Sequence, residues 1–178
     1  QAGNAIYSPE SITIKDCSDD VTLKSYYSAI TCKYDSDVDY DQIQDADISI
    51  LNSKVKATST NDSGIYASNQ LTINQQSDVT ANGMYCGLYG VEKISIEDSK
   101  VDATSTGYYD ENDDLWTDIA IFSNGNIALK SSNVHAKSVS DYSYYAIATH
   151  QWSDSNSEPV KTGITVDDRC ILPKGAKI

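Results

Sequence analysis

Basic residues are scarce in this chain, and the shortage narrows the classes of partner that it can have. Its 178 residues include 13 Lys or Arg against 26 Asp or Glu, a formal net charge of -13. Phosphate contacts need a stripe of positive charge, so this balance argues against binding to nucleic acids or anionic membranes. No apolar run approaches the roughly 20 residues that span a bilayer, and no secretory signal opens the sequence. We expect no membrane insertion, and either a mature protein or a piece of a larger one.

Closely spaced cysteines are lacking as well. The four cysteines, Cys17, Cys32, Cys86 and Cys170, form no C-x-x-C pair, which argues against a structural zinc site. We expect buried free thiols, because cysteine is often buried as a small hydrophobic residue. A disulfide between Cys17 and Cys32 is the alternative.

What the sequence does contain is typical of β structure. Its aliphatic residues are mostly small or β-branched, and Ser, Thr, Asp and Asn are abundant. Thirteen Tyr stand against one Met and one Phe. The length suits one domain with a sizeable interior, so residues 1–178 are predicted to form a single domain.

One stretch, residues 48–68, shows a pattern that recurs along the chain. Apolar and polar residues alternate in three short runs, which are separated by turns of Ser, Asn, Asp or Gly. The apolar members of these runs are Ile48, Ile50, Val55, Ala57, Ile65 and Ala67. Period two in short runs predicts strands, and repetition at just over twenty residues predicts a solenoid.

Equivalent positions of successive repeats form ladders of apolar residues. The first strands contribute Ile12, Ile48, Leu71, Ile94, Ile127 and Ile164, and the second strands contribute Val21, Val55, Val79, Val101 and Val134. Residues 4–8 resemble the third strand of a further coil, and the residues added in later repeats fall in turns or just after the third strand. One coil cannot bury its apolar positions alone, so we expect equivalent strands to stack in parallel, about 4.8 Å apart.

These features predict an all-β fold, a single-stranded right-handed parallel β-helix of about six coils with long inserts in the later coils. The handedness follows from the strong bias of parallel crossover connections. A serine precedes four of the second-strand valines by two residues, at Ser53, Ser77, Ser99 and Ser132. We expect these serines to form a ladder at one corner, where each hydroxyl bonds the backbone or the next serine.

The central residue of each third strand should point outward, because its two neighbours point inward. These residues are Tyr7, Thr31, Tyr66, Tyr89, Phe122 and Ala148. Flat aromatic faces suit the C–H faces of sugar rings, which makes the aromatic members candidate carbohydrate-binding residues, together with Trp116 from an insert. The alternative is that the rings pack on one another, or under the inserts, and so stabilise the sheet.

Two acidic clusters are candidate calcium sites. The first has carboxylates at alternate positions, on one side of an extended strand: Asp35, Asp37 and Asp39. The second has spacings similar to those of a calcium loop, without the turn glycine and terminal glutamate of an EF-hand: Asp110, Asn112 and Asp114. Calcium takes six to eight oxygen ligands, and clustered carboxylates repel unless a cation is bound. The alternative is that both clusters are solvated surface loops.

The coil pattern also carries a family resemblance. An I-x-I-x-x-S-x-V-x-A run, seen in ISILNSKV, LTINQQSDV, ISIEDSKV and IALKSSNV, precedes a GIYA-like strand. This pattern resembles the β-helical repeats of secreted and surface proteins of Gram-positive anaerobes, some of them carbohydrate-binding domains similar to pectate-lyase-like helices with bound calcium. The resemblance covers about Ile12 to Val166. It implies a secreted or cell-surface module, with a polysaccharide or glycan and other domains of the same surface protein as partners.

The same resemblance requires a search for catalytic residues. Lyases on this fold type combine carboxylate-held calcium with an arginine base, but Arg169 is the single arginine and belongs to the last coil. The histidines, His135 and His150, are far apart in sequence, and we expect His135 to be an unpaired surface residue. We therefore expect a non-catalytic carbohydrate-binding or adhesin-like module. The alternatives are a structural spacer of a larger surface protein and a polysaccharide lyase or hydrolase.

If an acidic cluster binds calcium, adding calcium chloride should raise the melting temperature by several degrees, because a ligand that binds only the native state stabilises it. EDTA should reverse the shift. Thermal unfolding with and without calcium measures the effect, and a melting temperature that calcium leaves unchanged would contradict the calcium prediction.

Overall fold

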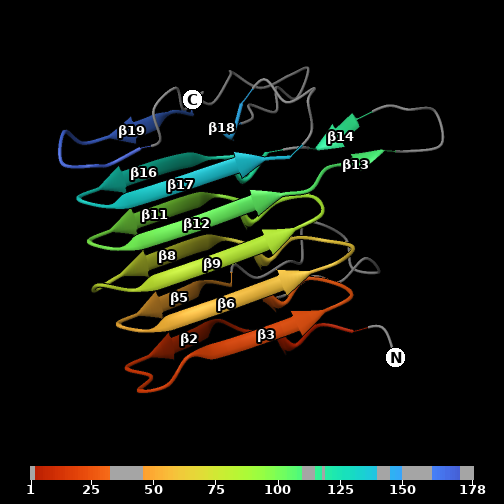
Figure 1. Ribbon diagram of the computed structural model, residues 1–178. Coiled ribbons are helices and arrows are strands. Elements are labelled where there is room, and N and C mark those ends of the chain that lie inside the picture. Colours follow the sequence, from red (N-terminus) through yellow and green to blue (C-terminus); the bar gives the residue numbers. More distant parts are fainter. Residues whose placement is uncertain are drawn as a thin grey trace.

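The computed structural model describes residues 3–32, 46–109, 115–117, 119–139, 145–149 and 162–172. These residues form an all-β structure of stacked strands and turns, without a helix (Figure 1). Accordingly, those ranges hold no helix long and apolar enough to cross a membrane.

Three parallel sheets make up the stack. Sheet A contains β1 (Ile6–Ser8), β4 (Ile30–Cys32), β7 (Ile65–Ala67), β10 (Leu88–Gly90), β15 (Ile121–Ser123) and β18 (Ile147–Thr149). Sheet B contains β2 (Ile12–Lys15), β5 (Ile48–Leu51), β8 (Gln70–Asn74), β11 (Lys93–Glu97), β16 (Asn126–Lys130) and β19 (Ile164–Val166). Sheet C contains β3 (Val21–Ser25), β6 (Lys54–Ser59), β9 (Asp78–Gly83), β12 (Lys100–Ser105) and β17 (Asn133–Ser138).

The chain visits the sheets in a fixed order, from B to C to A, and then starts the next layer of the stack. The two predicted ladders are confirmed residue by residue. In sheet B, Ile12 is paired with Ile48, and the pairing continues in register to Ile164. In sheet C, the same in-register pairing runs from Val21 to Val134. The architecture is therefore the parallel β-solenoid that the repeats predict.

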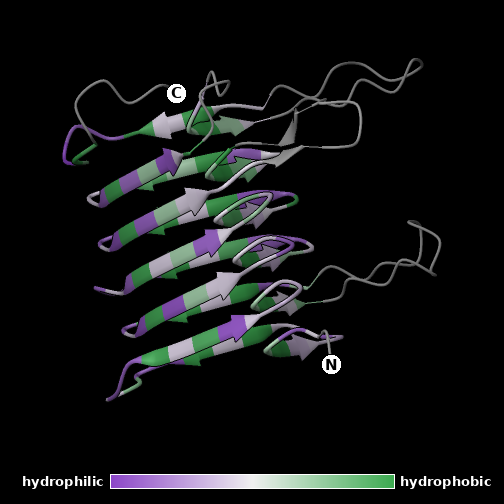
Figure 2. Ribbon diagram, turned by 45° about the vertical axis from the view of Figure 1, so that its right-hand side comes forward, coloured by the Kyte–Doolittle hydropathy of each residue, from purple (hydrophilic) through white to green (hydrophobic). Residues whose placement is uncertain are grey.

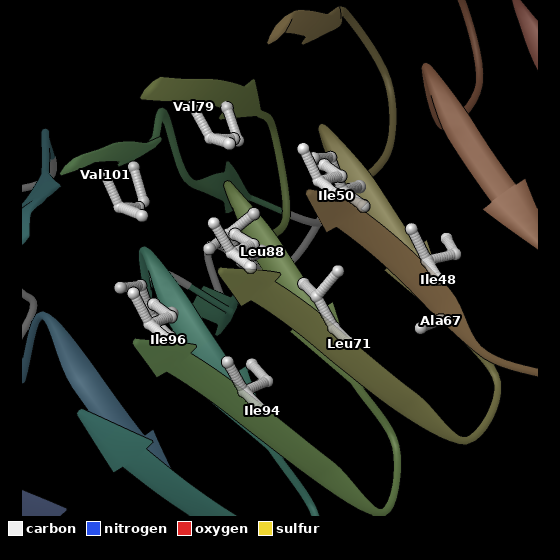
Figure 3. Close-up of a cluster of buried hydrophobic side chains, with 14 of the residues drawn as sticks. Ile48, Ile50, Ala67, Leu71, Val79, Leu88, Ile94, Ile96 and Val101 are labelled. Carbon is white, nitrogen blue, oxygen red and sulfur yellow. The ribbon is translucent and has the colours of Figure 1, made fainter. Parts of the chain in front are cut away.

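The interior is filled by the inward residues of all three sheets. Figure 2 shows hydrophobic and hydrophilic residues alternating along the strands, as half-buried strands require. In Figure 3, Ile48, Leu71 and Ile94 follow one another along sheet B, and Val79 and Val101 come from sheet C. All five are almost fully buried. Burial of each such side chain contributes about 1.5–3 kcal/mol, so the stack depends on repeating this interior layer after layer.

The corner serine ladder is also confirmed. The backbone N–H of Ser53 donates to Oγ of Ser77 (3.4 Å), and that of Ser99 donates to Oγ of Ser132 (3.2 Å). The hydroxyls of Ser53, Ser99 and Ser132 each donate to the carbonyl oxygen two residues earlier, at 2.8 Å. Oγ of Ser77 and Oγ of Ser132 thereby join two layers, the hydroxyls of Ser53, Ser99 and Ser132 close tight bends, and no catalytic role is needed to explain them.

The bend before each corner serine uses left-handed backbone. Asn52, Asp98 and Ser131 have φ values of 43°, 44° and 50°. Asn and Asp tolerate this region better than most residues with a Cβ. This tolerance accounts for Asn52 and Asp98, whereas Gln75 and Gln76, before Ser77, adopt the same region with φ values of 60° and 62° although they lack the short side chain.

None of the four cysteines forms a disulfide, as the sequence predicts. Cys32 and Cys86 are buried, and burial raises the pKa of the Cys32 thiol, whose Sγ donates to the carbonyl oxygen of Ala46 (3.0 Å). Cys17 and Cys170 are only half-buried, so the prediction that all four are buried is wrong for this pair. Both stand near an end of the stack, where no complete layer covers them.

The interior ladders predict how a buried charge acts. Val79→Asp should lower the free energy of unfolding by several kcal/mol, because Val79 is 0% exposed and a carboxylate there has no partner. The matched variant Thr80→Asp places the same group on the outward face of sheet C and should change stability by about 0.5 kcal/mol or less. Urea unfolding compares the two, and similar midpoints would contradict the inward register of Val79.

Candidate functional site

The outward row of sheet A holds the candidate binding residues. Parallel pairing places one residue of each strand beside its equivalent in the next, in the order Tyr7, Thr31, Tyr66, Tyr89, Phe122 and Ala148. The predicted register of this row is therefore confirmed. Because each strand has three residues with the outer two turned inward, one side chain per strand reaches this face.

Three neighbouring rings of the row are in contact, and we refer to Tyr66, Tyr89 and Phe122 as the aromatic strip. The rings of Tyr66 and Tyr89 meet edge to face, with centroids 5.1 Å apart and planes at 90°. Those of Tyr89 and Phe122 are 5.3 Å apart and tilted by 51°. All three side chains are half-buried. Aromatic pairs of this kind contribute about 0.5–1.5 kcal/mol beyond the burial of their area, so the strip also stabilises sheet A.

A polar group borders the strip. The hydroxyl of Tyr89 lies 3.3 Å from Oδ1 of Asn124, to which it donates a hydrogen bond. Asn124 follows directly after β15 and is half-buried. Sequence reasoning missed this residue because it lies in the turn after the third strand, where the period-two pattern has ended.

Tyr7 and Thr31 extend the row beyond the aromatic strip. Tyr7 is 49% exposed, but Thr31 separates it from Tyr66, so the two tyrosines lie about two strand spacings, roughly 9.6 Å, apart. The sequence predicts that Thr31 points outward, yet it is 1% exposed, and among the described residues its Oγ1 has no hydrogen-bond partner. A short side chain between two tyrosines is covered more easily than a long one. Tyr7 is therefore not part of the continuous strip.

Trp116 lies in a different element. It belongs to β14 (Leu115–Thr117), which pairs antiparallel with β13 (Tyr108–Tyr109) in a hairpin inserted between β12 and β15. Figure 1 shows this hairpin beyond the carboxyl ends of the sheet C strands. That Trp116 contributes to the same surface as the aromatic strip stays a prediction.

The predicted calcium ligands Asp35, Asp37, Asp39, Asp110, Asn112 and Asp114 all lie outside the described residues. Among the residues that the structure does describe, no three His, Cys, Asp or Glu side chains gather closely enough to hold a metal ion. Calcium binding at either cluster stays a prediction.

A charged row crosses the outward face of sheet C. Nζ of Lys100 lies 3.5 Å from Asp78 and 3.4 Å from Asp102, and Nδ1 of His135 lies 3.3 Å from Asp102. Asp78, followed by Asp102, raises the pKa of Lys100. The expectation that His135 is unpaired is wrong, because in-register pairing places it directly beside Asp102. These side chains are well exposed, so each pair contributes at most about 1 kcal/mol, and the row resembles surface charge rather than a catalytic site.

Comparison with known proteins adds no further assignment for this site. No protein-family model matches the sequence, and neither the curated proteins nor the solved structures gave a match.

The unpartnered hydroxyl of Thr31 gives a stability prediction. Thr31→Val should raise the free energy of unfolding by about 1 kcal/mol, because valine keeps the shape and removes a buried group that lacks a hydrogen bond. The control is Thr80→Val, a half-buried outward threonine of sheet C, for which we expect a change within about 0.5 kcal/mol. Urea unfolding measures both, and a Thr31→Val protein less stable than the wild type would contradict the absence of a partner.

Proposed function

We propose that this chain is a right-handed parallel β-helix that acts as a non-catalytic, extracellular carbohydrate-binding or adhesin-like module. The observation that carries the proposal is the aromatic strip, a row of three contacting rings on the outward face of a rigid sheet. Right-handedness is favoured because each sheet is built from parallel strands joined by crossovers, which are right-handed in nearly all proteins. The secreted or surface location rests on the resemblance of the repeats, and the non-catalytic role rests on the sequence, which offers no arginine or histidine constellation for catalysis.

The geometry of the strip favours a sugar that stacks on single rings. Tyr66 and Tyr89 are perpendicular, so they present one face and one edge instead of a continuous flat platform. A pyranose ring stacks its C–H face on an aromatic face, and its hydroxyls bond nearby polar groups. Asn124, at the edge of Tyr89, supplies such a group. The strip thus combines an apolar surface with a hydrogen-bonding rim.

Charge restricts the class of glycan. With a formal net charge of -13, the protein repels polyuronates and other polyanionic sugars unless a cation bridges the two. Neutral polysaccharides are therefore the ligands that we propose for the strip in the absence of calcium. The other partners proposed are further domains of the same surface protein.

The same contacts favour a second candidate function, that of a structural spacer. Edge-to-face packing at 5.1 Å and partial burial are what cross-strand aromatic residues show when they only stabilise a sheet. In that case the solenoid separates other domains of a surface protein, and the strip binds nothing.

Removal of two rings distinguishes the candidates. Tyr66→Ala combined with Tyr89→Ala should abolish retention on the neutral insoluble polysaccharides that the wild type binds, because both stacking faces are lost. The matched control replaces Tyr26 and Tyr27, an exposed edge-to-face pair with centroids 5.2 Å apart outside the strip, and should retain full binding. Pull-down assays on a panel of polysaccharides measure retention.

Each outcome assigns the strip a role. Retention that survives the loss of both Tyr66 and Tyr89 would remove the strip as the binding surface. A wild-type protein that binds no polysaccharide or arrayed glycan would favour the spacer. Melting temperatures of both double variants show whether a loss of binding comes from a loss of folding.

A further inference from the structure

No two rings of the aromatic strip lie in one plane. The plane of Tyr89 stands at 90° to that of Tyr66 and at 51° to that of Phe122. The planes of Tyr66 and Phe122 must therefore differ by at least 39°, which is 90° less 51°. In-register pairing places the three residues in one straight row, so their rings are aligned in position but turned in orientation.

The strip is also short. Thr31, which precedes Tyr66 in the row, is 1% exposed, and Ala148, which follows Phe122, has no ring. The strip therefore spans three strands, and its outer residues stand two strand spacings, roughly 9.6 Å, apart. A pyranose ring is about as wide as one strand spacing, so the strip has room for roughly two or three sugars.

Asn124 presents unused hydrogen-bond donors beside these rings. Its Oδ1 accepts the hydrogen bond of the Tyr89 hydroxyl at 3.3 Å, so the other end of the amide, Nδ2, points elsewhere. An amide NH2 can donate two hydrogen bonds, yet among the described residues Nδ2 of Asn124 donates none. Nor is Nδ2 sealed in the interior, because the one buried side-chain atom without a partner in that part of the chain is Oγ1 of Thr31. These donors are therefore open to a ligand.

Given the glycan-binding role proposed above, we infer that the strip binds separate, solvated chains of a neutral polysaccharide and not the flat surface of a crystalline one. A crystalline surface presents many chains in one plane, and stacking on it requires aromatic faces in one plane, which turned rings do not offer. A single chain can turn about its glycosidic bonds, so each sugar can meet the ring beside it.

Asn124 is the specificity-determining residue in this arrangement. It follows β15 directly and contacts Tyr89, so Nδ2 donates to a hydroxyl or ring oxygen of a sugar that stacks on Tyr89 or Phe122. Chains inside a crystal already bond their hydroxyls to neighbouring chains, whereas a solvated chain presents its hydroxyls on all sides. Donors at the edge of the strip therefore favour the solvated chain.

The first experiment compares two packings of the same polysaccharide. Pull-downs use amorphous and crystalline cellulose and amorphous and crystalline chitin, and affinity electrophoresis uses laminarin and galactomannan as soluble neutral chains. We expect binding to an amorphous or soluble form that is about tenfold or more tighter than binding to either crystalline form. Equal binding to the crystalline and amorphous forms would overturn the inference and leave the proposed function standing. A protein that binds none of the six would contradict the proposed function itself.

The second experiment tests the donors of Asn124. Asn124→Asp keeps the shape and the acceptor for Tyr89 but removes the N–H groups, so binding to whichever of amorphous cellulose, amorphous chitin, laminarin or galactomannan the wild type retains should weaken by about threefold to tenfold. The matched control is Asn82→Asp, the same change at a half-buried asparagine on the outward face of sheet C, which should bind as the wild type does. Melting temperatures show whether both variants fold. Unchanged binding by a folded Asn124→Asp protein would overturn the role of Asn124.

Discussion

In-register pairing of equivalent residues between layers is the constraint on which this structure depends. Because Ile48 stands beside Ile12 on one side and Leu71 on the other, an inward residue always packs against the same kind of residue above and below. The same pairing on the outward faces places Tyr66 beside Tyr89 in sheet A and Asp78 beside Lys100 in sheet C. An outward surface of this solenoid therefore consists of one position of the coil, repeated in successive layers, rather than of a specialised loop.

The strands and their register follow from sequence because both have short periods. Alternation fixes which side chains face inward, and the repeat fixes which residues become neighbours, so the ladder from Ile12 to Ile164 is correct at each rung. The aromatic strip follows by the same rule. Its ring angles do not, since they depend on side-chain packing that the pattern does not encode.

What the pattern misses lies in single contacts. The burial of Thr31 depends on the size of its neighbours, and the bond from Tyr89 to Asn124 depends on a turn residue outside the period. The sequence predicts an unpaired His135 because the two histidines are far apart in the chain, although its partner Asp102 stands on the adjacent strand. In each case the surroundings of the residue depend on which side chains the neighbouring layer places beside it. The position of the residue in the repeat does not specify them.

The sequence separation between paired strands also influences how the chain folds. Most pairing contacts join a coil to the next one, so the loops that must close before two strands meet are nearly all of similar, moderate length. Among the described strands, no pairing joins the two ends of the sequence, so any adjacent pair of coils can serve as the nucleus from which the others add. Folding then resembles growth from an existing edge.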